Sequence, residues 1–385
     1  MTDNPLVRLN RIGQSVWYDN IRRGLISSGE LERMVRAGEI RGITSNPSIF
    51  EAAIGRTAEY DPALRALSGR DREPEKAYEI LAVEDVRAAA DILRPVFEET
   101  GRKDGFVSLE VDPALAGDAE RTILEAKRLW ATVSRPNLMI KIPGTQACLP
   151  AIRKVIAAGI NVNVTLLFSV ERYQNVIGAY LSGLEDRAAN GESMEDVTSV
   201  ASFFVSRLDT CVDRFLDAII QNGGAMADQA RLLQGKAAIA NTRLAYQEFL
   251  AFRKGGRFLA LAARGARVQR PLWASTSTKN PAYPDTLYVE ALIARDSINT
   301  MPPATVDAYR DHGNPAVRIE DGLEQARNLT AALANLGILL AEVTAQLETE
   351  GVAAFQQAFD AMLEAIRKKT QPAGKEETFS ASKRL

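Results

Sequence analysis

Short apolar runs alternate with longer amphipathic segments along this chain, and each short run has the length of a buried β-strand. Strands separated by helical segments are typical of a parallel sheet wrapped by helices. There are eight such runs, and eight parallel strands with helices between them close most naturally into a (β/α)8 TIM barrel. We therefore expect an α/β fold of that class. The runs are Ser15–Asp19, Gly42–Ser45, Phe106–Val111, Leu138–Ile142, Asn161–Thr165, Ser199–Val205, Pro271–Ser275 and Ser297–Met301.

The segment between the first two runs has the signals of a complete helix. Ser28 can cap it, Leu31, Met34 and Val35 share one face, and Gly38 can end it. The resulting strand, helix and strand form the repeating unit of the predicted barrel.

Two intervals are too long for one crossover helix, and we expect them to be helical insertions. The first covers about 50–105 and includes a helix over Val86–Thr100, which Pro95 can kink. The second covers about 207–256, where glycine pairs at 223–224 and 255–256 are expected to break the helix and then to end it. We expect this second insertion to pack outside the sheet.

Helical periodicity resumes after the last strand, from Ile319 to about Arg367. From Gln371 the chain turns polar and is expected to be disordered. We therefore expect one barrel domain over 1–370, with its insertions and C-terminal helices, and a tail over 371–385. Four apolar residues recur at helical spacing before the tail and are expected to be core: Phe355, Phe359, Met362 and Ile366.

Composition and charge limit the kind of partner. The 385 residues are 46% hydrophobic and 25% charged, which is typical of a soluble globular chain with a large core. A net charge of −2 gives no general attraction to nucleic acid or to an anionic membrane. Charges throughout 1–14, and the lack of any apolar run approaching 18 residues, predict neither secretion nor a membrane span. We expect a cytoplasmic monomer or homodimer with small-molecule partners.

Cysteine and histidine are too few for several common kinds of site. Cys148 and Cys211 have no zinc-type spacing and are expected to be buried, reduced thiols. His312 is the single histidine, so a metal site with two histidine ligands is impossible and a Ser/His triad would depend on this residue alone. We expect His312 to lie in a surface loop.

Lys141 stands inside an apolar strand-like run that Pro143 and Gly144 close. Burying an ammonium group costs several kcal/mol unless it is paired, so burial favours the neutral amine. A neutral amine is the nucleophile that Schiff-base enzymes need. The alternative is that Lys141 lies at the strand end with its head in solvent.

Polar side chains collect at or near the carboxyl ends of several predicted strands. Residues two apart share a face of a strand, and a barrel gathers these ends into one mouth. Singly, Asp19 could cap a helix, Glu110 could pair with a surface arginine, and Asn163 or Thr165 could bond backbone groups. Together they favour a polar network around a buried lysine. The pairs are Trp17 with Asp19, Ser108 with Glu110, Met139 with Lys141, Asn163 with Thr165, and Ser202 with Phe204.

These residues stand in sequence motifs that resemble the transaldolase family, in the same order and over most of the chain. The resemblance implies transfer of a dihydroxyacetone unit from sedoheptulose 7-phosphate or fructose 6-phosphate to glyceraldehyde 3-phosphate or erythrose 4-phosphate. It implies no metal or organic cofactor. The motifs occupy 17–19, 44–48, 107–112, 139–145, 160–169, 201–207 and 273–280.

The resemblance also implies a role for each polar residue. Lys141 forms the Schiff base, and Asp19 removes the proton from the C4 hydroxyl. Glu110 and Thr165 hold the water that shuttles protons. The residues implied to bind the sugar are Asn46, Ser108, Asn163, Ser202 and Phe204.

Three residues are implied to bind the phosphate group: Arg207, Ser277 and Lys279. Better-known transaldolases have arginine at the position of Lys279, so a point charge replaces a planar fork here. Ser206 stands where that branch has glycine. The differences, with the long insertion before the seventh strand, indicate a distinct branch of the family.

The sequence leaves two other functions open. A Schiff-base aldolase that releases free dihydroxyacetone would have a similar barrel and lysine, and would turn over without an acceptor aldehyde. A catalytically silent sugar-phosphate binding protein would lack the lysine or a carboxylate, whereas Lys141, Asp19 and Glu110 are all present.

Overall fold

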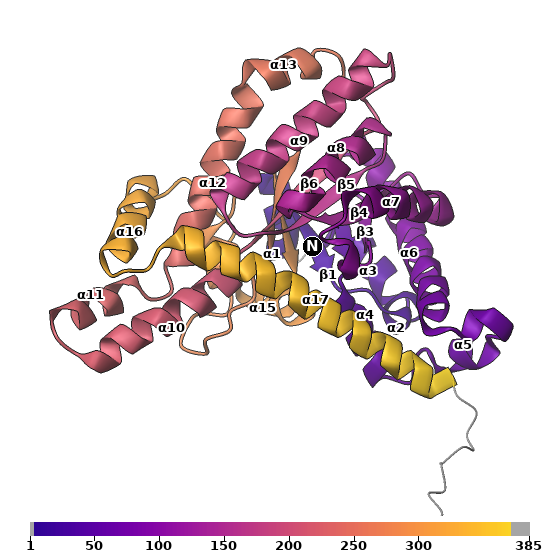
Figure 1. The fold of residues 1–385 in the computed structure, drawn as a ribbon, viewed down its shortest axis with the longest axis horizontal. Helices are drawn as coiled ribbons and strands as arrows, with labels where there is room; N and C mark the ends of the chain where they lie inside the picture. Colours follow the sequence, from indigo (N-terminus) through magenta and orange to yellow (C-terminus); the bar gives the residue numbers. More distant parts are fainter. Residues whose placement is uncertain (1–3, 371–385) are drawn as a thin grey trace, which may run out of the picture.

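A computed structural model describes residues 4–370, and in it eight parallel strands close into a barrel in chain order, with β8 paired to β1. Helices surround the barrel (Figure 1). This confirms the predicted (β/α)8 fold, and each predicted strand is present to within about two residues at its ends. The strands are β1 (Gln14–Asp19), β2 (Gly42–Thr44), β3 (Phe106–Glu110), β4 (Leu138–Pro143), β5 (Val162–Leu167), β6 (Ser199–Phe204), β7 (Arg270–Ala274) and β8 (Ser297–Met301).

The helices of the first half of the chain include the predicted crossover and the first insertion. They are α1 (Pro5–Ile12), α2 (Arg23–Ser27), α3 (Glu30–Arg36), α4 (Pro47–Phe50), the π-helical turn η1 (Glu51–Gly55), α5 (Asp61–Ala66), η2 (Gly69–Arg72), α6 (Pro74–Glu99), η3 (Pro113–Leu115), α7 (Ala119–Val133), η4 (Gln146–Cys148) and α8 (Leu149–Ala157).

The helices of the second half form the second insertion and the C-terminal region. They are α9 (Val170–Ala189), α10 (Ser206–Asn222), α11 (Ala225–Leu233), α12 (Ala237–Lys254), α13 (Gly256–Ala262), α14 (Leu287–Ala291), α15 (Pro303–His312), α16 (Leu323–Asn335) and α17 (Leu340–Thr370).

Helix ends differ from the predictions at two places. Ser28 closes α2 rather than capping α3, because Gly29 adopts a left-handed conformation (φ +76°) and joins the two helices directly. The long helix that contains Pro95 begins at Pro74 instead of Val86. Gly255 ends α12 after Lys254, as predicted, and a separate short helix, α13, begins at Gly256.

The second insertion lies outside the barrel, as predicted. Gly223 and Gly224 have φ values of +74° and +83°, and they separate α10 from α11. These two helices project together from one side of the molecule, at the left of Figure 1. The insertion therefore leaves the strands' carboxyl ends open while placing the start of α10 beside them.

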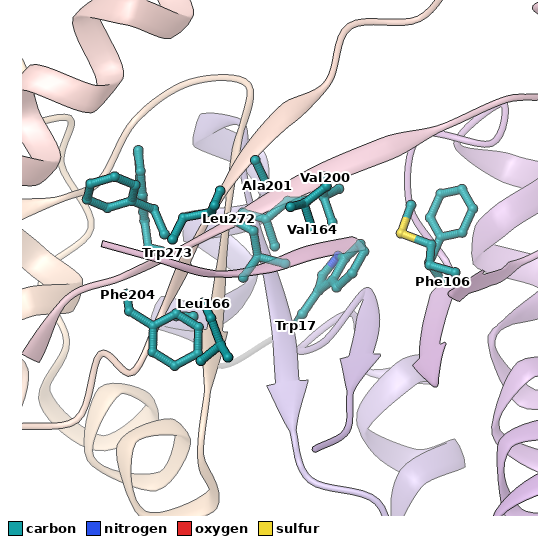
Figure 2. Packing of buried hydrophobic residues seen from close by; sticks show 14 of the residues in the cluster. Trp17, Phe106, Val164, Leu166, Val200, Ala201, Phe204, Leu272 and Trp273 are labelled. Atoms are coloured by element: carbon teal, nitrogen blue, oxygen red, sulfur yellow. The ribbon is translucent and has the colours of Figure 1, made fainter. Parts of the chain in front are cut away.

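Large apolar side chains fill the barrel and the space beneath its helices. Figure 2 shows part of this cluster, including Val164, Val200 and Leu272, each fully buried. Burying a side chain of this size contributes about 1.5–3 kcal/mol. Trp17 lies so close to β2 that a Cβ added at Gly42 would stand 2.5 Å from the indole, so only glycine fits there.

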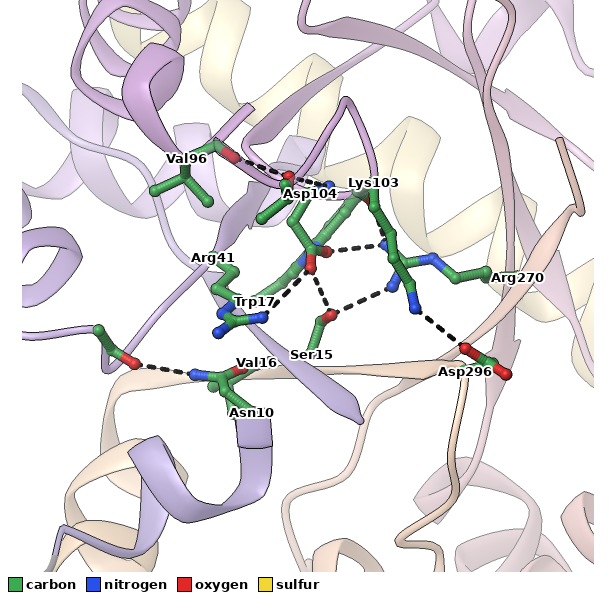
Figure 3. A network of polar contacts seen from close by, with 12 residues as sticks. Asn10, Ser15, Val16, Trp17, Arg41, Val96, Lys103, Asp104, Arg270 and Asp296 are labelled. Atoms are coloured by element: carbon green, nitrogen blue, oxygen red, sulfur yellow. Dashed lines mark hydrogen bonds and ion pairs between the residues drawn. The ribbon is translucent and has the colours of Figure 1, made fainter. Parts of the chain in front are cut away.

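A buried ion pair closes the barrel end opposite the carboxyl ends of the strands (Figure 3). Arg270 Nη2 lies 2.8 Å from Asp104 Oδ1, and both side chains are at most 3% exposed. Ser15 Oγ donates to Asp104 Oδ2 at 2.7 Å, and Trp17 Nε1 donates to Oδ1 at 3.2 Å. Burial acts to raise the pKa of Asp104, but Arg270 and these donors outweigh it and hold the pKa below its usual value.

The last helix, α17, runs across the front of the barrel in Figure 1. It packs against α4, α6, α10 and the end of β5. Its predicted stripe is buried, with Phe355, Phe359, Met362 and Ile366 at most 8% exposed. No single helix within 4–370 has the length and hydropathy of a membrane span; α16 and α17 meet those criteria only together, bent by 89°. The tail expected over 371–385 lies outside the described residues, and the prediction of one domain stays a prediction.

The two cysteines are buried, whereas the single histidine lies at the surface. Cys148 and Cys211 are buried free thiols, as predicted. His312 is exposed, but it is the last residue of α15 and not part of a loop, and its ring lies 2.9 Å from Asp285 and 3.2 Å from Asp311. These two carboxylates raise the pKa of His312. The histidine therefore belongs to a surface charge cluster.

Candidate active site

Lys141 is buried and paired, which excludes the alternative of a lysine with its head in solvent. Its Nζ donates to Glu110 Oε2 at 2.9 Å and to the carbonyl oxygen of Ser45 at 3.0 Å. The two charged side chains are only 5% and 4% exposed. The pair follows from the sheet register, because Glu110 and Lys141 are opposite one another on β3 and β4. A neighbouring carboxylate offsets the cost of burying the ammonium group.

One carboxylate oxygen of Glu110 has no hydrogen-bond partner among residues 4–370. This atom, Oε1, is buried, and so is Oγ1 of Thr165, which also lacks a partner among these residues. Burial raises the pKa of Glu110, although Lys141 opposes the shift. Thr165 is placed by a distortion of β5, where the register with β6 shifts between Val164 and Leu167 and Leu166 has φ +60°. Two buried oxygens are thus available for a substrate oxygen or a water molecule.

Asp19 ends β1 and is held by a threonine from the next strand. Thr44 Oγ1 donates to Asp19 Oδ1 at 2.6 Å and lies 2.5 Å from Thr300 Oγ1. Burial raises the pKa of Asp19, while the Thr44 hydrogen bond and the charge of Lys141 act in the opposite direction. The carboxyl group is therefore fixed in place and is a stronger base than an exposed aspartate.

Three buried polar residues support the floor of the mouth. Ser202 Oγ donates to Asn163 Oδ1 at 2.7 Å, and Asn163 Nδ2 donates to Ser108 Oγ at 3.0 Å. This hydrogen-bonded chain of side chains links β6, β5 and β3 inside the barrel. Because each member bonds to the next, the network fixes the rotamers beneath the cavity.

A cavity of about 540 Å³ opens at the carboxyl ends of the strands. Most residues that the sequence predicted for the site line it. Ser108, Asn163 and Glu110 are the exceptions: the first two lie beneath the cavity in the polar chain, and Glu110 reaches the site through Lys141. The predicted residues in the lining are Asp19, Asn46, Lys141, Thr165, Ser202, Phe204, Arg207, Ser277 and Lys279.

Two neighbouring cations, Arg207 and Lys279, line the cavity. Arg207 lies in the first turn of α10, and Lys279 follows β7, where its Nζ donates to Ser277 Oγ at 2.7 Å. Neither cation forms an ion pair with a carboxylate within residues 4–370. Burial lowers the pKa of Arg207, and desolvation followed by the charge of Arg207 lowers that of Lys279. Two neighbouring cations and a hydroxyl can bind a phosphate group.

Asn46 is shared between the fold and the cavity. Its Oδ1 accepts from the backbone N–H of Ile49 at 3.0 Å and caps α4. No hydrogen bond from its Nδ2 occurs within 4–370, so this amide can donate into the cavity.

Sequence reasoning missed several residues of the lining. Thr44, Ser275 and Thr300 are hydroxyl residues at or just after strand ends, so the rule that located Asp19 could have found them. Phe355 was assigned to the core by its helical spacing; it is 3% exposed, but its ring also lines the cavity. The ring centroid is 5.2 Å from Lys141 Nζ and 5.7 Å from Arg207 Cζ.

A family model and several individual proteins that are similar to this chain all indicate the same family. The family model for transaldolase/fructose-6-phosphate aldolase matches residues 16–366. Transaldolase 1 of Streptomyces avermitilis is 50% identical over 366 residues, which cover 95% of each chain. Transaldolase 1 of Streptomyces coelicolor is 48% identical over 97% of each chain, and the transaldolase of Trichodesmium erythraeum is 45% identical over 96% of this chain and 99% of its own. The chain therefore belongs to the transaldolase family.

Proposed function

We propose that Lys141 is the Schiff-base residue of this transaldolase, and that the residues around it have the roles described below. The enzyme transfers a dihydroxyacetone unit from sedoheptulose 7-phosphate or fructose 6-phosphate to glyceraldehyde 3-phosphate or erythrose 4-phosphate. The main support for the residue roles is the buried contact of 2.9 Å between the Lys141 amine and Glu110. Such a contact supports a nucleophile with its proton acceptor beside it, next to a cavity that Arg207 and Lys279 also line.

The first step joins the donor sugar to the enzyme. Glu110 takes a proton from the Lys141 ammonium, and the free amine adds to the C2 carbonyl of the donor. The carbinolamine then loses its oxygen as water and becomes a protonated iminium. Glu110 Oε1 and Thr165 Oγ1 are free to hold the water that carries these protons.

The second step breaks the donor. Asp19 removes the proton from the C4 hydroxyl, the bond between C3 and C4 breaks, and its electron pair moves onto the iminium to give an enamine. The aldehyde product leaves with its phosphate. The half-buried Asp19, oriented by Thr44, suits this general-base role.

The third step runs the same chemistry in reverse with an acceptor. The enamine carbon adds to the acceptor aldehyde, and the Asp19 carboxylic acid returns the proton to the new hydroxyl. Water then releases the product and restores the Lys141 amine. Arg207, Ser277 and Lys279 bind the phosphate of donor and acceptor alike, so both aldehydes reach the enamine in one orientation.

Asn46 and the polar chain of Ser108, Asn163 and Ser202 position the dihydroxyacetone unit. Ser202 and Asn46 line the cavity and contact the sugar hydroxyls, with Phe204 as an apolar wall. Ser108 and Asn163 act from beneath by fixing Ser202.

Borohydride trapping tests the covalent step. Wild type incubated with fructose 6-phosphate and borohydride should gain a dihydroxyacetone-sized adduct, and peptide mapping should place it on Lys141. Lys141→Ala should gain none, whereas Lys279→Ala should retain the adduct at high donor concentration. An enzyme that turns over without forming an adduct would exclude the Schiff base.

Acceptor dependence separates transfer from simple aldol cleavage. A transaldolase consumes fructose 6-phosphate rapidly only when an acceptor aldehyde is present. Equal consumption with and without glyceraldehyde 3-phosphate would assign the chain to the aldolase side of its family. A protein that binds the sugar phosphate without consuming it would be a silent binding protein, which the presence of Lys141, Asp19 and Glu110 opposes.

We further propose that the enzyme works in the cytoplasm, as a monomer or homodimer, and without a metal or organic cofactor. The two buried free thiols, Cys148 and Cys211, suit a reducing compartment. No step above needs a cofactor. Cell fractionation, light scattering and an assay after chelation would test these three points.

A further inference from the structure

The ring of Phe355 lies beside both the Lys141 amine and the Arg207 guanidinium. Its centroid is 5.2 Å from Lys141 Nζ and 5.7 Å from Arg207 Cζ, both within the range of a cation–π contact. Phe355 comes from α17, far along the chain from every barrel strand. The last helix therefore contributes a wall to a site that is otherwise built from strand ends and the loops after them.

The position of Phe355 is fixed by the way α17 is held. On one side of Phe355, Glu348 forms a 3.1 Å ion pair with Arg172 of α9. On the other side, Lys369 lies 2.8 Å from Asp61 at the start of α5. Between these anchors α17 approaches the end of β5 closely, because a Cβ added at Gly351 would stand 3.1 Å from the Leu166 side chain. Gly351 is one turn before Phe355.

Arg207 is enclosed by two aromatic rings. Its guanidinium carbon lies 5.1 Å from the ring centroid of Phe204 and 5.7 Å from that of Phe355. Such contacts hold a planar guanidinium without using its N–H donors, which stay free for phosphate. Phe355 thus covers the amine with its ring and also borders the phosphate-binding fork.

We propose that Phe355 shields the covalent intermediate from water, so that the dihydroxyacetone unit waits for an acceptor aldehyde. This inference rests on the proposed Schiff-base role of Lys141. It assigns to α17 a part in deciding between transfer and hydrolysis, the two outcomes that separate a transaldolase from an aldolase that releases dihydroxyacetone.

The unwanted reaction has defined steps. The enamine takes a proton on the carbon that was C3 of the donor and becomes an iminium. One water molecule then adds to C2, and the carbinolamine collapses to free dihydroxyacetone and the Lys141 amine. Both the proton and the water must reach the lysine-bound carbons. An apolar ring over the amine reduces the water available there, while an acceptor aldehyde still enters along the phosphate-binding end.

The partition between the two reactions tests the proposal. The measured quantity is the rate of dihydroxyacetone release from fructose 6-phosphate without acceptor, divided by the rate of transfer with saturating glyceraldehyde 3-phosphate. Phe355→Ala should raise this ratio by on the order of tenfold, because it opens the lysine to water. Phe355→Leu keeps an apolar side chain and should raise it less.

Phe359→Ala is the matched control. Phe359 lies one turn further along the same helix and is 8% exposed, but its ring packs on Tyr78 with the centroids 5.3 Å apart and does not line the cavity. Phe359→Ala should therefore have the same ratio of dihydroxyacetone release to transfer as wild type. A similar rise in Phe359→Ala and Phe355→Ala would attribute the effect to a loosened α17 and overturn the proposal.

Borohydride trapping in each variant separates this proposal from the proposed function. If wild type forms no adduct on Lys141, the Schiff-base mechanism itself has failed. If the adduct forms in both Phe355 variants and the ratio stays at the wild-type value, the mechanism stands and the shielding role is wrong. Should Phe355→Ala not fold, Phe355→Leu still decides, because a ratio unchanged from wild type contradicts the proposal.

Discussion

The hydroxyl of Tyr283 donates to Asp213 Oδ2 at 2.8 Å and ties the segment after β7 to α10. Asp213 Oδ1 also accepts from the backbone of Gly235 at 3.0 Å. The segment carries Ser277 and Lys279, and α10 carries Arg207. A single carboxylate therefore joins the two parts of the chain that bind phosphate in the proposed mechanism.

Tyr283→Phe should raise KM for fructose 6-phosphate more than it lowers kcat. A hydrogen bond to a charged group is worth about 1.5–3 kcal/mol, and its loss loosens the segment that carries Lys279. Tyr60→Phe is the control, because Tyr60 donates to buried Asp85 at 2.7 Å away from the cavity. Steady-state kinetics on both variants decide the point: equal KM values in the two would remove any special role for Tyr283.

Asp209, one turn before Asp213, should make stability depend on pH between about pH 4 and neutrality. Burial raises the pKa of Asp209 to about 7, although Ala238 N–H and Tyr288 donate to it at 2.7 and 2.9 Å. A carboxyl whose pKa is raised on folding contributes stability that is complete below its unfolded pKa of about 4 and is lost as pH rises through the folded value. The unfolding temperature should therefore fall as pH rises from about 4 to about 7, by on the order of a few degrees, and this contribution should level off above that range.

Asp209→Asn isolates that contribution, because asparagine is similar in shape and stays neutral. The variant should show a flatter dependence of unfolding temperature on pH than wild type between about pH 4 and 7. An unchanged slope would mean that another group titrates in this range.

Strand periodicity was sufficient to predict the barrel and to bring part of the candidate site to the strand ends, whereas Asn46, Arg207, Ser277 and Lys279 were predicted only from the family resemblance. Alternation placed Asp19, Glu110 and Lys141 on inward faces at strand ends, and parallel strands necessarily bring those ends together. The contact between Glu110 and Lys141 needed the register of β3 on β4 as well, which a sequence pattern does not specify. The pairing therefore became visible only in the structure.

Phe355 shows where sequence reasoning stops. Its spacing with Phe359 and Met362 indicates that one face of a helix is buried, and that is correct. It carries no information about what covers the face, which depends on how α17 packs across the barrel. The Ser28 cap was wrong for a related reason, since Gly29 allows two helices to join where side-chain capping alone predicted a single helix.

Asp104→Ala should destabilise the protein by about 3–5 kcal/mol, because it leaves Arg270 charged and unpaired inside the barrel. Urea unfolding measures the loss. Asp186→Ala, which breaks the exposed pair of Asp186 with Arg153 at 2.7 Å, should have little effect. Comparable losses in both variants would contradict the importance of burial.

Asp104 should also make stability depend on pH, with a sign opposite to that of Asp209. The pKa of Asp104 is held below its usual value, so its contribution to stability is present above the unfolded pKa of about 4 and is lost as pH falls through the folded value. Wild type should lose more stability below pH 4 than Asp104→Asn does. If wild type and Asp104→Asn lose the same stability below pH 4, other carboxylates are responsible for the acid unfolding.

Lys279 offers a test of the phosphate site that separates charge from geometry. Lys279→Ala should raise KM for fructose 6-phosphate by about tenfold, since a charge-assisted contact is lost, and should leave the slower reaction with fructose unchanged. Lys279→Arg should keep or lower KM, because a planar fork binds two phosphate oxygens. Lys154→Ala on α8, away from the cavity, is the control. Equal effects on phosphorylated and unphosphorylated donors would place Lys279 outside the phosphate site.

The hydrogen bond from Thr44 should set the acid limb of activity. Asp19 must be ionised to act as the base, and its pKa is raised by burial and lowered by the Thr44 hydroxyl at 2.6 Å. Thr44→Val removes the donor, so the pKa of Asp19 should rise further and the acid limb of kcat/KM should move to higher pH. Thr300→Val is the matched control, because Thr300 contacts Thr44 at 2.5 Å and makes no hydrogen bond to Asp19 within 4–370. If both variants keep the wild-type acid limb, Asp19 is not the group that controls it; a shift in Thr44→Val alone identifies Asp19 as the base.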